Sequence, residues 1–194
     1  MLIGRSTIQP AANTTTEKIV QNKVKKTKPI PKKNSIPEEL NTPKLKELYI
    51  KASKGDPEAQ CLLGDVYYDG EEVEQNAPRS VSWYKKAANQ NHAEAQYCLG
   101  WHYLKGLGIR RDDDEAFKWH KKAAEQGHVK SQYLVAFAYE VGTDFGASLP
   151  KNEKEAVKWY RKAAEQGHAD AMICLARHFM DGEGIEKSYE EAER

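Results

Sequence analysis

The heptapeptide Gln126-Gly127-His128-Val129-Lys130-Ser131-Gln132 decides the fold, because variants of it recur along the chain. The variants occupy residues 54–60, 90–96 and 166–172. The second position of the motif is Gly or Asn, and its successive copies are 36, 36 and 40 residues apart. A fixed period of about 20 to 50 residues is typical of solenoid proteins. The sequence therefore predicts a protein built from stacked repeats.

Each repeat contains two helical patterns, which we call helix A and helix B. In helix A, apolar residues recur with the i, i+4, i+8 spacing of one helical face, as at Ala59, Leu63 and Tyr67. Helix B carries an aromatic residue and an Ala-Ala pair on one stripe, as at Trp119 and residues 123–124. Polar residues precede helix B and Gly or Asn follows it, which is the expected capping arrangement. Each repeat is therefore predicted to be a pair of helices separated by turns.

A small residue stands beside the central apolar residue of every helix A. These residues are Gly64, Gly100, Ala136 and Ala176. Gly inside a helix costs about 1 kcal/mol relative to Ala, so its presence needs a packing reason. We expect the neighbouring helix to approach closely at this position.

Two segments carry a family resemblance: residues 63–70 (LGDVYYDG) and residues 121–128 (KKAAEQGH) resemble the Sel1-like repeat, a relative of the tetratricopeptide repeat. The resemblance covers about residues 44–194. It implies an all-α fold, a right-handed solenoid of antiparallel helix pairs, and a role as an adaptor or scaffold. The chain departs from the pattern at Glu72, at Asn91 and in a loop insertion near residue 143. Asn tolerates the left-handed conformation, so the turn at Asn91 is expected to form.

A second face of helix A differs from repeat to repeat and follows the spacing i, i+3, i+7, i+10. By similarity to tetratricopeptide units, this face lines a concave groove that holds a partner segment. The residues assigned to this predicted groove are Glu94, Tyr97, Trp101, Leu104, Lys130, Tyr133, Phe137, Glu140 and Arg177. Aromatic residues are enriched in binding hot spots, and aromatic residues flanked by charges suit an extended or helical peptide.

An alternative interpretation of the same aromatic residues is structural. Tyr97 and Tyr133 would then fill gaps between stacked repeats. Trp101 and Phe137 would be separate exposed aromatics, which need no functional explanation.

The sequence contains no recognisable catalytic triad, phosphate-binding loop or metal motif. His92, His128 and His168 occupy the same position at the start of helix A, which predicts capping and inter-repeat hydrogen bonding rather than metal binding. His102 and His178 are also repeat-equivalent, and we expect each to face a neighbouring helix or solvent. We therefore expect no catalytic residue, no cofactor and no metal.

The cysteines Cys61, Cys98 and Cys174 cannot all pair with one another, and we expect them to be small buried or half-buried apolar residues. By resemblance, the cysteine-rich secreted members of the family carry a cysteine pair in each repeat, and some have been linked to β-lactam binding. This chain has at most one cysteine in each repeat, which removes the structural basis for such a role.

Charge is unevenly distributed along the chain. The net charge is +1, but residues 1–43 carry +5 and the remainder carries −4. The total gives no electrostatic reason to bind nucleic acid. No apolar run approaches the roughly 18 residues of a membrane-spanning helix, and no secretory signal is visible. We expect a cytoplasmic protein, with nuclear import through the basic run at residues 23–33 as a further possibility.

The composition divides the chain into three parts. Residues 1–34 are expected to form a disordered basic arm, and residues 35–55 are expected to form N-terminal capping helices. Residues 56–194 hold the repeats, at about 56–91, 92–127, 128–167 and 168–194. The last repeat is expected to be incomplete, with its end covered by a chain continuation or by a partner.

These observations predict a non-catalytic adaptor that binds a protein or peptide segment in the predicted groove. By resemblance, one alternative is a regulatory subunit of a partner enzyme, as in fungal chitin synthase activators or ER quality-control ligase complexes. A second alternative is a secreted bacterial effector or a β-lactamase-like protein.

Overall fold

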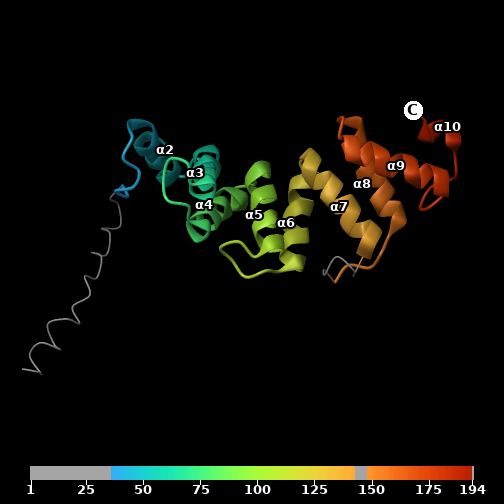
Figure 1. The fold of residues 1–194 in the computed structure, drawn as a ribbon, viewed down its shortest axis with the longest axis horizontal. Helices are drawn as coiled ribbons and strands as arrows, with labels where there is room; N and C mark the ends of the chain where they lie inside the picture. Colours follow the sequence, from blue (N-terminus) through green and yellow to red (C-terminus); the bar gives the residue numbers. More distant parts are fainter. Residues whose placement is uncertain (1–35, 143–147, 194) are drawn as a thin grey trace, which may run out of the picture. The chain divides into compact units, whose positions relative to one another are not determined.

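The computed structural model describes residues 36–142 and 148–193, which contain helices and no strand (Figure 1). The helices are α2 (Pro43–Ser53), α3 (Pro57–Asp69), α4 (Ala77–Asn89), α5 (Ala93–Lys105), α6 (Asp113–Glu125), α7 (Val129–Val141), α8 (Glu153–Glu165), α9 (Ala169–Asp181) and α10 (Tyr189–Ala192). The expected disordered arm, including the basic run at residues 23–33, lies outside the described residues. So does part of the loop insertion, at residues 143–147.

The repeats form an α-solenoid, because each helix packs on the next one along the chain. Helices α3, α5, α7 and α9 are the predicted helices A, and α4, α6 and α8 are the predicted helices B. They follow one another in a row from α2 to α9 (Figure 1). The prediction of an all-α solenoid of helix pairs is confirmed. Within the region expected to hold capping helices, the described residues form one helix, α2, which packs on α3.

Side-chain caps determine where these helices begin. The side chains of Asn76, Asp112 and Asn152 accept a hydrogen bond from the third backbone N–H of α4, α6 and α8. A cap of this kind satisfies an N–H that has no partner within the helix. Asn91, between α4 and α5, has a φ of 66°, so this Asn does adopt the left-handed conformation that Gly adopts in the other copies of the motif.

The small residue of helix A allows a close helix–helix approach, as predicted. A Cβ atom placed on Gly64 would lie 2.6 Å from the Tyr84 ring of α4. A Cβ atom on Gly100 would lie 2.7 Å from the His120 ring of α6. Both distances are shorter than van der Waals contact. Gly at these positions therefore lets helix B pack its ring directly on the backbone of helix A.

Buried glutamines join successive repeats. The Gln96 amide of α5 donates to the carbonyl oxygen of Ala88, at the end of α4, at 3.2 Å, and accepts from the Gln126 amide at 2.7 Å. The same arrangement occurs one repeat earlier, with Gln60, and one repeat later, with Gln132. We call this set the glutamine ladder; its members are Gln60, Gln90, Gln96, Gln126, Gln132 and Gln166. It links α3, α5 and α7 each to the helix before it and to the glutamine that ends the helix after it.

The glutamine ladder stops at α9. Met172 stands where Gln60, Gln96 and Gln132 stand in the earlier repeats, and 47% of its surface is exposed. A methionine side chain has no amide to donate to the preceding helix. The last junction between repeats in the described chain therefore lacks this hydrogen-bonded link.

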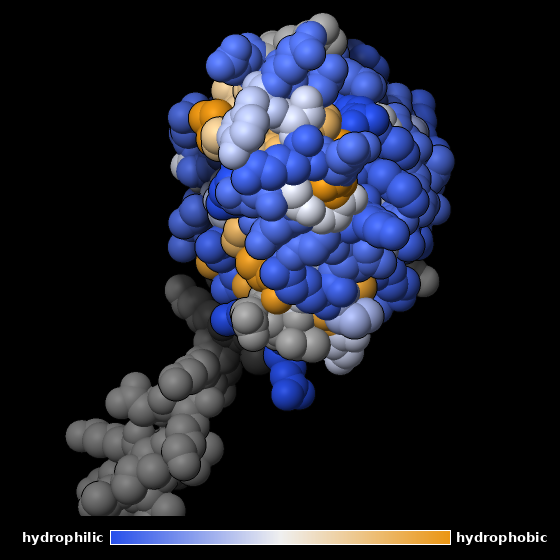
Figure 2. All heavy atoms as spheres, turned by 90° about the vertical axis from the view of Figure 1, so that its right-hand side faces the viewer, coloured by the Kyte–Doolittle hydropathy of each residue, from blue (hydrophilic) through white to orange (hydrophobic). Residues whose placement is uncertain are grey.

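The fourth repeat is also less covered than the others. Leu63, Leu99 and Val135 are fully buried, whereas the equivalent Leu175 is half-buried. The side chain of Phe179 is buried, with the Arg161 guanidinium 5.9 Å from its ring centroid. Ile173 and Met180 are exposed on α9, and Figure 2, which views this end of the molecule, shows apolar residues in orange between hydrophilic ones. On the last helix A, Leu175 and Met180 are therefore less covered than Phe179.

We expect Gly64→Val to lower the free energy of unfolding by about 1–3 kcal/mol, because the added atoms overlap the Tyr84 ring. Urea unfolding followed by circular dichroism measures the change. Ser82→Val, on the exposed face of α4, adds a β-branched residue without a clash and should change stability by no more than about 0.5 kcal/mol. Equal effects of the two substitutions would contradict the close-approach explanation.

We expect Gln96→Met to cost about 1–3 kcal/mol, since it removes both ladder hydrogen bonds from a site that is 99% buried. The side chain keeps nearly the same size, so little of the loss comes from packing. Met172→Gln is the matched reverse change, and it should leave stability unchanged or raise it. Unfolding midpoints that rank these two variants in the opposite order would refute a stabilising role for the glutamine ladder.

Candidate functional site

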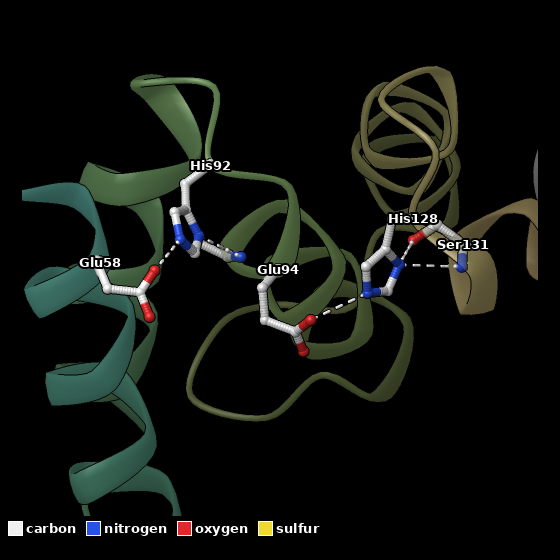
Figure 3. Close-up of polar contacts among 6 residues, drawn as sticks. Glu58, His92, Glu94, His128 and Ser131 are labelled. Atoms are coloured by element: carbon white, nitrogen blue, oxygen red, sulfur yellow. Dashed lines mark hydrogen bonds and ion pairs between the residues drawn. The ribbon is translucent and has the colours of Figure 1, made fainter.

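Histidines at the start of helix A connect neighbouring repeats (Figure 3). His92 lies 2.8 Å from a Glu58 carboxylate oxygen through its Nε2, while its Nδ1 accepts from the Ala95 N–H at 3.2 Å. His128 repeats this arrangement with Glu94, at 3.1 Å, and with Ser131. Because Nδ1 accepts, Nε2 carries the proton and donates to the carboxylate. The predicted capping and inter-repeat hydrogen bonding are confirmed for both histidines.

The third histidine of this kind has a different partner. His168 caps α9 by accepting from the Ala171 N–H at 3.3 Å. Lys130 stands where Glu58 and Glu94 stand in the other repeats. The His168 ring instead stacks on Tyr133, with centroids 4.8 Å apart and an interplanar angle of 15°. Its capping role is confirmed, and its contact with the preceding helix A is aromatic.

Several predicted groove residues also hold repeats together. Glu94 bonds to His128, and the Tyr97 ring packs on the same imidazole with centroids 4.7 Å apart. The Lys130 ammonium lies 5.7 Å from the centroid of Tyr97. The Tyr97 and Tyr133 rings therefore fill inter-repeat contacts, which is what the structural interpretation expects of these two residues.

Glu140 and Arg177 pair with each other. Glu140 accepts hydrogen bonds from the Arg177 guanidinium of α9 and from the Tyr160 hydroxyl of α8. Glu140 is mostly covered, whereas the Arg177 side chain is half exposed. These two charges of the predicted groove thus stabilise the junction between α7 and α9, and the outer edge of Arg177 stays accessible.

Trp101, Leu104 and Phe137 occupy a different environment. All three are half-buried, and Trp101 and Phe137 hold the same position on the successive helices α5 and α7. The Lys105 ammonium lies 4.7 Å from the centroid of the Trp101 ring. We call these three residues, with Lys105, the aromatic surface. It is apolar, partly exposed and bordered by a cation.

In the first and third repeats, a Tyr–carboxylate hydrogen bond forms at positions that Trp101 and Leu104 of the aromatic surface hold in the second repeat. The Tyr84 hydroxyl donates to Asp65 at 2.6 Å, and the Tyr160 hydroxyl donates to Glu140. In the second repeat, which lies between these two, Trp101 stands at the position of Asp65, Leu104 at that of Glu140, and His120 at that of the two tyrosines. The fold therefore tolerates both a carboxylate and an apolar residue here. Packing of the repeat does not by itself require an aromatic at position 101.

Three histidines are buried inside the solenoid. His102 and His178 each contact a loop carbonyl through Nδ1, at 2.7 Å from Leu107 and 2.9 Å from Glu183. Both are 1% exposed and contact a tyrosine ring of a neighbouring helix, Tyr84 for His102 and Tyr160 for His178, so of the two expected alternatives the neighbouring helix is confirmed. His120 is buried with no hydrogen-bond partner for either ring nitrogen. Burial, with a smaller contribution from the nearby His128, lowers the pKa of His120 to about 4.

One group in the described chain has the spacing of metal ligands. Atoms of Glu153, His178 and Glu183 lie within 4.8 Å of one another. However, the His178 Nδ1 contacts the Glu183 carbonyl, and the Lys151 ammonium pairs with Glu153 at 2.5 Å. These contacts hold the loop after α9 on α8, while the buried Glu153 Oε2 and His178 Nε2 have no hydrogen-bond partner.

The cysteines are unpaired, as expected. Cys61 is buried, and Cys98 and Cys174 are half-buried. Burial raises the pKa of the Cys98 thiol to about 12, so it is protonated and unreactive at neutral pH. None of the helices in the described part of the chain has the length and apolar character that crossing a bilayer requires.

Sequence reasoning missed three features: the glutamine ladder, the buried His120 and a pocket between α2 and α3. The ladder had a visible signal, because Gln recurs at residues 60, 96 and 132 and again at 90, 126 and 166. The burial of His120 was detectable only by noting that it replaces a tyrosine beside a glycine. The pocket depends on how α2 packs on α3, for which the sequence offered no signal.

The helix pairs, the Gly–aromatic contacts and the His–Glu junctions together define a helical-repeat protein of the solenoid class. The Sel1 repeat model matches residues 57–92, 93–128, 129–168 and 169–194. The chain therefore belongs to the Sel1 repeat family. Members of this family are generally protein-interaction modules, and they are typically non-catalytic.

Solved structures of Sel1 repeat proteins are similar to this chain. A Sel1 repeat protein from Oxalobacter formigenes is 37% identical with a TM-score of 0.72, over 80% of this chain and 62% of that one. A protective antigen of uropathogenic Escherichia coli with an SLR fold is 32% identical with a TM-score of 0.70, over 76% of this chain and 31% of that one. The match thus spans less than two thirds of either relative.

Cysteine-rich protein B of Helicobacter pylori shares the fold, with 24% identity and a TM-score of 0.50, over 68% of this chain and 96% of that one. No curated protein sequence matches the chain.

We expect the buried His120 to make stability fall in mild acid. The unfolded histidine titrates near pH 6.5, whereas the folded one titrates near 4, so below about pH 6.5 only the unfolded state gains this proton. The resulting loss in the free energy of unfolding is absent above about pH 6.5 and grows as the pH falls toward 4. It should reach about 2 kcal/mol at pH 5, and His120→Phe should remove it.

Urea unfolding of both proteins at about pH 7 and about pH 5 measures this difference. His102 is retained in both proteins, so its own titration cancels in the comparison. An unchanged pH dependence in His120→Phe would show that His120 has the same pKa in the folded and unfolded states.

Proposed function

We propose that this chain is a non-catalytic adaptor whose aromatic surface binds a segment of a partner protein. The observation that carries the proposal lies in the second repeat, where Trp101 stands at the position of Asp65 in the first repeat and Leu104 at the position of Glu140 in the third. A Trp whose ring faces the Lys105 ammonium and stays half exposed fits the composition of an interaction hot spot. Family membership supports the same class of function.

The neighbouring charges indicate the kind of segment that would fit. Lys130 and Arg177 are exposed near the aromatic positions of α5 and α7, although each also contacts a residue of the preceding helix A. Phe137 holds on α7 the position that Trp101 holds on α5. A peptide with apolar anchors and an acidic residue would satisfy both features.

The partner could itself be an enzyme, which would make this chain a regulatory subunit. The aromatic surface would serve both roles, and the two differ only in whether the bound partner gains activity. No contact within the described residues favours the enzyme partner over another protein. The adaptor therefore remains the function proposed.

A pull-down from native lysate with the wild type and with Trp101→Ala/Phe137→Ala tests the proposal. Truncation of hot-spot residues costs about 2 kcal/mol or more, so capture of a specific partner should fall at least about tenfold. Helical circular dichroism should be retained, because neither side chain is fully buried.

Ile50→Ala/Tyr189→Ala is the matched control, since it removes exposed apolar side chains from α2 and α10. It should capture the same partners as the wild type. An identical partner list from the Trp101/Phe137 variant would remove the aromatic surface from consideration as the binding site.

A further inference from the structure

A pocket of about 480 Å³ lies between α2 and α3, at the opposite end of the described repeats from α9. Its floor is apolar and includes Leu48, Ala59, Leu62 and Val66. The side chain of Leu62 is prominent there, with 45% of the residue exposed. We call this pocket the α2–α3 groove.

Repeat symmetry identifies what packs on such a surface elsewhere in the chain. Asp56, Leu62 and Val66 line the groove, and their equivalents one repeat later are His92, Cys98 and His102. All three equivalents face α3: His92 bonds to Glu58, Cys98 packs in the same apolar cluster as Cys61, and His102 contacts the Tyr68 ring at 5.3 Å. Through these three contacts, helix A of the second repeat packs on helix A of the first.

Helix α2, the other wall of the groove, corresponds to α4 of the first repeat. The carbonyl of Ala52 in α2 accepts from Gln60, just as the carbonyl of Ala88 in α4 accepts from Gln96. Helix α2 therefore occupies the position of a helix B. Together, α2 and α3 present the surface on which a preceding helix A would pack, and no described residue fills that place.

The charges of the groove differ from those of an internal junction. Inside the solenoid, His92 precedes α5 and Lys105 ends it. At the same positions of α3, the chain has Asp56 and Asp69. Seven acidic and two basic side chains lie among the lining residues of the groove. Both lysines are already paired, Lys51 with Glu47 at 2.9 Å and Lys44 with Glu72 at 3.8 Å. The groove therefore has an uncompensated negative charge around an apolar floor.

We propose that the α2–α3 groove binds a basic amphipathic helix of a partner protein, which takes the position of a preceding helix A. The apolar face of that helix covers Leu62 and Val66, and its Lys or Arg side chains meet Asp56, Asp69 and Glu71. Helix-in-groove recognition of this kind uses apolar anchors at i, i+3, i+4 and i+7. This site is separate from the aromatic surface on α5 and α7.

Titration calorimetry on the full chain tests the proposal with a peptide of about 14 residues, made of Leu at the helical i, i+3, i+4, i+7 spacing and Lys elsewhere. The wild type should bind it, and a peptide with Glu in place of every Lys should not bind. Asp69→Lys/Glu71→Lys should weaken binding at least about tenfold, and Leu62→Ala should weaken it about threefold or more.

Glu125→Lys/Glu165→Lys is the matched control, because it makes the same charge change at exposed positions at the ends of α6 and α8. It should bind the Lys peptide like the wild type. Trp101→Ala/Phe137→Ala should also bind it normally, so a failure of the aromatic surface and a failure of this groove give different results.

Three results would overturn the proposal. The first is equal binding by the Asp69/Glu71 variant and the control, and the second is equal affinity for the Glu peptide. The third is tighter binding after Lys25, Lys26, Lys32 and Lys33 are replaced by Gln, because the chain's own basic run would then be the competing occupant.

Discussion

A buried amide hydrogen bond in front of α3, α5 and α7 is the contact on which most of the structure depends. The amides of Gln60, Gln96 and Gln132 each join a backbone carbonyl behind them to a second glutamine ahead of them. Leaving such a buried group without a partner costs about 1–3 kcal/mol, so a shift of one helix along the next is strongly disfavoured. Helices α3, α5 and α7 are thereby held in one register, which also places His92 against Glu58 and His128 against Glu94.

Much of this architecture follows from local chemistry that the chain repeats. The caps at Asn76 and Asp112, the left-handed turn at Asn91 and the glycine beside Leu63 act over a few residues, so their spacing alone predicts helices, turns and a close helix–helix approach. The period then predicts that each unit packs on the next, because one helix pair cannot bury its apolar face alone. These are the reasons why the fold class and the roles of His92 and His128 could be predicted before the structure was known.

The candidate site was harder to predict because its residues serve two purposes. Glu94, Glu140 and Arg177 lie on the face expected to meet a partner, yet each bonds to a side chain 34 to 37 residues away in the sequence. Helical spacing shows which face a residue shares, but not whether a neighbouring helix already uses its charge. Asp65 and Trp101 hold the same position in successive repeats, yet Asp65 accepts a hydrogen bond from Tyr84 whereas Trp101 is apolar and half exposed.

The methionine at position 172 affects how stability is distributed along the solenoid. Proteins made of stacked repeats behave as one-dimensional arrays in which each unit is stabilised by its own fold and by its nearest neighbours. The earlier junctions contain a buried amide link, whereas the junction in front of α9 relies on the Tyr133–His168 stack and the Glu140–Arg177 pair. Among the described repeats, α9 is therefore the segment whose opening costs least. Amide protons should exchange with solvent there while those of α3 to α6 remain protected, so that the molecule loses its structure from one end rather than all at once.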